Sequence, residues 1–238
     1  MQNTQRTLLV AAALFLASVG SVLVNAQAKT VWDGVYTDEQ AARATAVFNS
    51  TCSNCHTLDA SGNRPLSGQG FLDSYTQKTV GDLLAYVSKN MPNGVNAGTL
   101  PAATYNDLVA LVLKSNGFPA GATEVTPESV ATVQIIGKDG SAELPAGTLV
   151  RVVGCLTKGG SDWVLASATT PERADKAGVG AEDATRPLGS GEMPLKFVLQ
   201  RLDKFAGQRM SVSGLLMGAG GKDGINVTTV NQVAPTCP

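Results

Sequence analysis

The 238-residue chain contains very little histidine and little charge. His56 is its only histidine, 16% of its residues are charged and the formal net charge is −1. There is no stripe of basic residues of the kind that nucleic-acid binding requires. The glycine-rich segment 218–221 reads as a turn between strands, so it does not match the strand-to-helix loop that holds a dinucleotide phosphate. The sequence therefore argues against nucleic-acid and dinucleotide binding.

Long hydrophobic runs are also scarce, and the one present lies at the N-terminus. Arg6 precedes an apolar run from Leu8 to Val24, and Ala26-Gln27-Ala28 fits a small-residue cleavage site. This pattern predicts a secretory signal peptide over residues 1–28 and a periplasmic protein that begins near Lys29. A retained membrane anchor is the alternative, although the run is slightly short for a span. Nothing later in the sequence reads as a stable membrane span.

Only four cysteines occur, and two of them form the segment Cys52-Ser53-Asn54-Cys55-His56. This is the C-x-x-C-H attachment signature of a c-type haem. Two thiols one turn apart can bond the two vinyl groups of one haem c, and the histidine then becomes an axial ligand of the iron. A zinc site would need further ligands nearby. A thioredoxin-like pair would follow a strand, whereas the residues before Cys52 are helical in pattern.

Methionine is a common second axial ligand of haem iron in electron carriers. Met91 is followed by a proline and lies one predicted helix after His56, so we expect it on the opposite side of the iron. Met193, which also precedes a proline, is the rival. A methionine that only fills the core is the third possibility. With Met91 bound, the iron has no open position for a substrate, and the chain is an electron carrier and not an enzyme.

Helical periodicity covers the first half of the chain. Thr37 and Gln40 fit a capping box, and the helix that follows leads directly into the haem motif. A loop is expected over 59–70. Further helices are expected over 80–90, capped by Thr79, and over 102–115, where glycine and proline follow.

These features resemble a class I, single-haem cytochrome c of the exported bacterial type. The segments that carry the resemblance are Val31–Thr37, Cys52–His56, Pro65–Gly68, Met91-Pro92 and Asn116–Pro119. The resemblance implies a helical fold around the haem over residues 29–120. It also implies that the carbonyl of Pro65 accepts a hydrogen bond from the axial histidine. The first of these segments is similar to cytochrome domains that travel with quinoprotein dehydrogenases, which hints at redox partners.

The second half changes to strand signals after an expected linker over 121–129. We expect an all-β domain over 130–238, with strands near 130–137, 148–154, 162–168, 195–200, 209–217 and 225–233. The number and spacing of the strands favour a small OB-like barrel, with a β-sandwich as the alternative. The segment 169–192 is expected to be a mobile loop. Trp163 and Phe197 are the aromatic residues best suited to a binding platform.

The remaining cysteines, Cys155 and Cys237, both lie in the second half. An even remainder in an exported chain favours a disulfide between them. Free buried thiols are the alternative.

The sequence thus predicts a two-domain, all-α then all-β protein that carries one covalent haem c between a dehydrogenase donor and a respiratory acceptor. Two alternatives remain open. One is a haem subunit of a quinoprotein dehydrogenase complex. The other is a haem enzyme or sensor, if Met91 is not a ligand.

Overall fold

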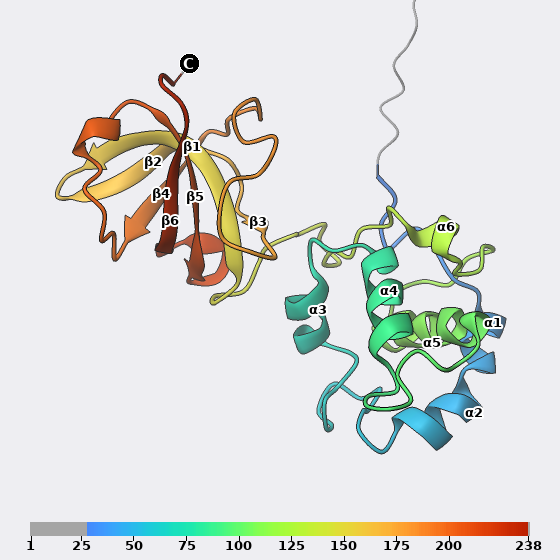
Figure 1. Cartoon of the computed structure of the whole chain (residues 1–238). Helices are drawn as coiled ribbons and strands as arrows, with labels where there is room; N and C mark the ends of the chain where they lie inside the picture. The colour runs from blue at the N-terminus through green and yellow to red at the C-terminus, as the bar shows by residue number, and fades with distance from the viewer. Residues whose placement is uncertain (1–27, 238) are drawn as a thin grey trace, which may run out of the picture.

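The computed structural model describes residues 28–237 and contains two regions, one helical and one built of strands (Figure 1). Residues 1–27, which contain most of the predicted signal peptide, lie outside the described part. Within residues 28–237, no helix has both the length and the apolar character needed to cross a membrane.

The helical region contains six α-helices. Their bounds are α1 Asp38–Arg43, α2 Thr45–Val47, α3 Gln69–Tyr75, α4 Val80–Asn90, α5 Ala102–Ser115 and α6 Pro127–Val130. A π-helical turn, Phe48–Cys52, continues α2. Helices α4 and α5 coincide with the predicted ranges, and Thr79 caps α4 in a reciprocal capping box with Asp82. Helix α3 was not expected.

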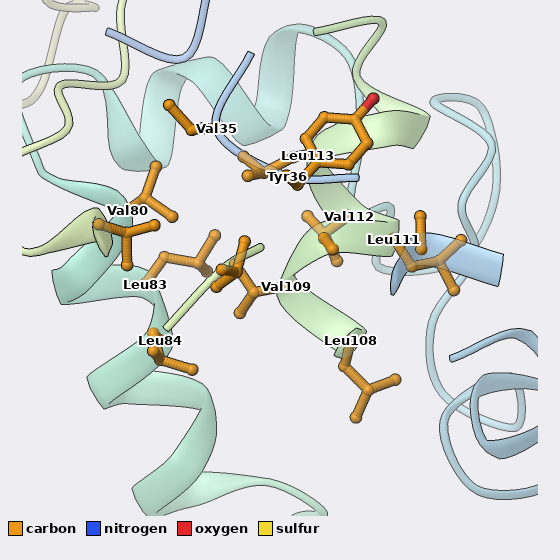
Figure 2. Close-up of a cluster of buried hydrophobic side chains, with 14 of the residues drawn as sticks. Val35, Tyr36, Val80, Leu83, Leu84, Leu108, Val109, Leu111, Val112 and Leu113 are labelled. Atoms are coloured by element: carbon orange, nitrogen blue, oxygen red, sulfur yellow. The ribbon is translucent and has the colours of Figure 1, made fainter. Parts of the chain in front are cut away.

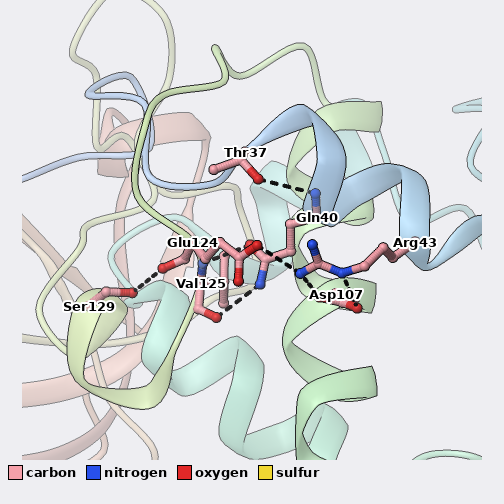
Figure 3. Close-up of polar contacts among 7 residues, drawn as sticks. All are labelled: Thr37, Gln40, Arg43, Asp107, Glu124, Val125 and Ser129. Carbon is pink, nitrogen blue, oxygen red and sulfur yellow. Dashed lines mark hydrogen bonds and ion pairs between the residues drawn. The ribbon is translucent and has the colours of Figure 1, made fainter.

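Only one of the two hydrogen bonds of the predicted capping box at α1 forms. The Thr37 hydroxyl accepts a hydrogen bond from the Gln40 amide at 3.1 Å (Figure 3). The Gln40 side chain does not reach back to residue 37. It is buried, and its amide group makes two hydrogen bonds to the backbone of Val125, at 3.0 and 2.7 Å. Gln40 thus joins the first helix to the chain beyond α5.

The first hydrophobic core lies between α4, α5 and the segment that precedes α1 (Figure 2). Tyr36 is buried there and donates a hydrogen bond to the carbonyl of Phe118 at 2.7 Å. The same core contains four buried apolar residues from beyond residue 120, namely Val125, Val130, Val133 and Ile135.

The burial of these four residues contradicts the expected linker over 121–129 and the expected strand over 130–137. The segment forms the short helix α6, and Gln134 makes only isolated bridges to Thr30 and Thr79. Its alternating apolar residues bury themselves against helices, not in a sheet. The second core begins at Leu144, so the two cores divide between residues 135 and 144.

The sheet region contains six strands. They are β1 Leu149–Gly159, β2 Asp162–Ala168, β3 Glu172–Arg173, β4 Gly191–Lys196, β5 Arg209–Met217 and β6 Gly224–Ala234. Their order is β2-β4-β6-β5-β1-β3, and β2 also pairs with β1. Only the β4–β6 pair is parallel. The inward side chains, Val152, Leu165 and Ile225 among them, form the second core.

The predicted disulfide is confirmed. Cys155, on β1, and Cys237, after β6, are bonded, and their Cα atoms are 5.7 Å apart. The Cys237 amide also donates a hydrogen bond to the carbonyl of Gly207 at 3.2 Å. The C-terminal end of the described chain is therefore fixed to the sheet.

The segment 169–192, expected to be a mobile loop, is held against β5 by polar contacts. The Asp183 carboxylate is fully buried and accepts hydrogen bonds from the Ser211 hydroxyl at 2.6 Å and from the Gly180 amide at 2.7 Å. The Arg209 guanidinium donates to the Asp183 carbonyl at 3.0 Å. Composition misled the prediction here, because a few buried polar groups hold a segment that contributes little to the apolar core.

Candidate haem site

The haem motif occupies the turn that follows α2. Its π-helical turn ends at Cys52, whose carbonyl accepts hydrogen bonds from the amides of Cys55 at 3.1 Å and His56 at 2.9 Å. Both thiols are free, with Cys52 half-buried and Cys55 exposed. Burial raises the pKa of the Cys52 thiol. The backbone therefore holds the two thiols one turn apart, next to the histidine.

A carbonyl group orients the His56 ring. Nδ1 of His56 lies 3.0 Å from the carbonyl oxygen of Arg64. Since a carbonyl only accepts hydrogen bonds, this contact favours the tautomer with the proton on Nδ1. Nε2 then keeps its lone pair, which is the arrangement that a metal-ligating histidine needs.

The carbonyl that faces His56 belongs to Arg64 and not, as expected, to Pro65. The loop is held on both sides by Thr57, whose amide donates to the carbonyl of Asn63 at 3.1 Å and whose carbonyl accepts from the amide of Leu66 at 2.9 Å. Arg64 adopts a positive φ of 40° between these bonds. This local turn, which cannot be deduced from the spacing of residues in the sequence, points the Arg64 carbonyl at the His56 ring. Pro65 itself follows that carbonyl and fixes the next φ angle.

Met91 lies at the C-terminal end of α4, and its backbone is held at three points. Its amide donates to the carbonyl of Val87 at 3.0 Å, and its carbonyl accepts from the amide of Gly98 at 3.1 Å. The hydroxyl of Tyr105, on α5, donates to the same carbonyl at 2.7 Å. The hydrogen bond of the Tyr105 hydroxyl had no signal in the sequence. These three hydrogen bonds therefore fix the backbone from which the half-buried Met91 side chain extends.

The rival methionine has a different setting. Met193 lies on β4, is only 5% exposed and belongs to the second core. Its neighbours there are the apolar side chains of the sheet. This packing accounts for Met193 without a role at the haem.

Comparison with known protein families gives a match to the model described as cytochrome c oxidase, cbb3-type, subunit III, over residues 39–112. The matched segment is therefore similar to a cytochrome c domain. It begins in α1, contains the haem motif and Met91, and ends within α5. Searches of curated proteins and of solved structures found no match. The match supports a class I c-type cytochrome in the helical region, which precedes a sheet-rich region.

The residues of the cytochrome c domain fit a covalent haem c. Two free thiols stand one turn apart, and the adjacent histidine has its Nδ1 engaged by a carbonyl. Partly buried apolar side chains next to the motif, Leu58 and Leu66, pack against the first core. Cys52 and Cys55 would attach the group, and His56 would hold its iron from one side.

Proposed function

We propose that the protein is a periplasmic electron-transfer protein that carries one haem c with His56 and Met91 as axial ligands. When bound, the haem supplies a one-electron redox centre whose potential the axial ligands and their neighbours set. The observation that carries the proposal is the geometry of Cys52, Cys55 and His56, with the ring fixed by the Arg64 carbonyl.

The chain's own residues contribute binding and orientation. Cys52 and Cys55 fix the position of the group covalently. The Arg64 carbonyl holds the proton on Nδ1 of His56, which orients the ring and leaves the lone pair of Nε2 free for the iron. The Gly98 amide and the Tyr105 hydroxyl both donate hydrogen bonds to the Met91 carbonyl, and these bonds hold the loop that presents Met91.

The donor and acceptor are further parts of this proposal. A dehydrogenase donor and a respiratory acceptor suit a one-electron carrier. The matched family is described as a subunit of a cytochrome c oxidase, which supports a respiratory acceptor.

For the sheet region we propose an OB-like barrel. The supporting observation is the cycle of strand pairs, in which β1 pairs with β2, β2 with β4, β4 with β6, β6 with β5 and β5 with β1. In this cycle β4 and β6 are parallel. An experimental structure with a different pairing order would replace this assignment.

The axial assignment is tested by a matched pair of substitutions, Met91→Leu and Met193→Leu. Both preserve side-chain volume and remove a thioether. Met91→Leu should allow carbon monoxide and cyanide to bind the haem protein and should lower its reduction potential, because methionine ligation raises it. Met193→Leu should change neither property. Tight binding of carbon monoxide by the unsubstituted protein would favour an enzyme or sensor instead.

A further inference from the structure

One end of the sheet region exposes two large apolar side chains on a single loop. Phe197 is 69% exposed and Leu199 is 98% exposed, both in the segment that follows β4. Val198, between them, packs against the second core, and Leu202 is buried. Val198 and Leu202 therefore anchor the loop, while Phe197 and Leu199 are exposed to solvent.

The backbone conformation of Phe197 also indicates that the loop is held in place by its surroundings. Its φ is +56°, in the left-handed region that a bulky residue rarely adopts. Unfavourable backbone conformations of this kind persist where the surroundings impose them, and they concentrate at functional sites.

Several charged residues lie on the same loop or on the strand ends beside it. Trp163 pairs with Leu195, and Lys196 forms an ion pair with Asp162 at 3.0 Å, so the loop starts beside the turn between β1 and β2. Six charged residues lie at the adjoining ends of β1, β2 and β4 and in the segment that runs through η2, the 3₁₀ helix Asp203–Phe205: Lys158, Asp162, Lys196, Arg201, Asp203 and Lys204.

Four of these charges are positive and two are negative, although the whole chain has a net charge of −1. Among residues 28–237, Arg201 and Lys204 have no carboxylate within 4.0 Å. Lys158 and Lys196 are ion-paired with Asp203 and Asp162, so Arg201 and Lys204 supply the excess positive charge on the segment that carries the apolar pair. In Figure 1 the β1–β2 turn is on the side of the sheet region that faces away from the helices.

We propose that this end of the sheet docks the protein onto a membrane surface that contains anionic phospholipid. Two exposed apolar side chains, with Arg201 and Lys204 on the same segment, match the boundary between acyl chains and anionic headgroups. A protein partner would need a contact of roughly 800 Å² on each side, much more than one loop tip offers. The docking requires no membrane-spanning helix and does not depend on the redox role.

The experiment uses the haem-loaded chain from Lys29 onward, which contains every residue of the two cores. It is sedimented with vesicles of phosphatidylcholine alone and of phosphatidylcholine with about one third phosphatidylglycerol. The expected result is sedimentation with the anionic vesicles that weakens as salt is raised. No sedimentation, or equal sedimentation with both vesicle types, would overturn the proposal.

Two variants test the residues. Phe197→Asn with Leu199→Ser should reduce the partition coefficient at least about tenfold, because it removes two large apolar groups from the interface. Asparagine tolerates the left-handed backbone, so the fold should be kept. Arg201→Gln with Lys204→Gln should reduce binding by roughly tenfold or more and flatten the salt dependence.

The matched control removes exposed apolar side chains elsewhere. Val95 and Val179 are 99% and 54% exposed, and Val95→Ser with Val179→Ser should leave vesicle binding unchanged. The calorimetric melting transition of the sheet region, together with the haem spectrum, serves as the check of folding in every variant. If the Phe197/Leu199 variant bound vesicles like the parent, the proposal would be wrong. It would also be wrong if this substitution only converted a dimer into a monomer, because the loop would then contact a second copy.

Discussion

At the scale of single residues, Gln40 makes the most consequential polar contact of the helical region. It is 1% exposed, and its side chain is bonded to both backbone groups of Val125, which is itself fully buried. Replacing it with alanine would leave a buried amide and a buried carbonyl without partners. Gln40→Ala should therefore lower the free energy of unfolding by about 2–4 kcal/mol. Denaturant unfolding followed by haem absorbance measures this change.

The adjacent substitution Glu39→Ala is the control, because Glu39 is exposed on the same helix. It should alter stability by no more than about 0.5 kcal/mol. Equal stability of the two variants would show that Gln40 does not join α1 to the chain beyond α5.

Single residues also show what the sequence could and could not predict. Cys52, Cys55 and His56 are adjacent in the chain, so their chemistry is readable from spacing alone. The partner of His56 is not, because it depends on two backbone hydrogen bonds that place Arg64 rather than Pro65 opposite the ring. A carbonyl has no sequence identity, so only the folded loop reveals which one is used.

At the scale of elements, the disulfide between β1 and the segment after β6 closes the sheet region. It joins residues 82 positions apart. In the chain-entropy model such a loop stabilises the folded state by about 4–5 kcal/mol as an upper figure. Cys155→Ser with Cys237→Ser should therefore lower the melting temperature of the sheet region and leave the haem-monitored transition nearly unchanged. Calorimetry combined with haem absorbance separates the two transitions.

The matched treatment is mild reduction of the unsubstituted protein, which should reproduce the effect of the double substitution. Recovery of both cysteines in alkylated form from the unreduced, unfolded protein would contradict the bond itself.

Elements were predictable where local signals agreed. The helices over 80–90 and 102–115 have apolar spacing together with clear start or stop residues, and the structure confirms their limits. The segment 130–137 has β-prone residues but no strand partner, since Val133 and Ile135 pack against helices. The secondary structure of this segment depends on long-range contacts, which periodicity alone does not predict.

At the scale of the whole molecule, two side chains join the helical and sheet regions. The Arg173 guanidinium donates to the carbonyls of Asp73 at 2.7 Å and Thr76 at 3.2 Å, at the C-terminal end of α3. The Gln77 side chain accepts from the Arg173 amide at 2.9 Å and donates to the carbonyls of Ala142 and Pro171, both at 3.0 Å. Burial lowers the pKa of Arg173, with nearby Asp175 and Asp73 acting in the opposite sense.

Arg173→Ala should loosen this contact without unfolding either core. We expect faster proteolysis between residues 136 and 143 and a larger radius of gyration in solution scattering, because the removed side chain supplies two of the bonds. Lys176→Ala, at an exposed position three residues later, is the control and should change neither quantity. An Arg173→Ala protein that matched the parent in both measurements would show that the two regions are held together by other contacts.

Covalent attachment of a haem at Cys52 and Cys55 can be decided by mass spectrometry of the purified protein after acid–acetone extraction. Extraction removes haem that is held only through the iron, whereas thioether-bonded haem stays with the chain. We expect a mass equal to that of the polypeptide plus one haem, and a protein that keeps its colour. A mass equal to that of the bare polypeptide would contradict it.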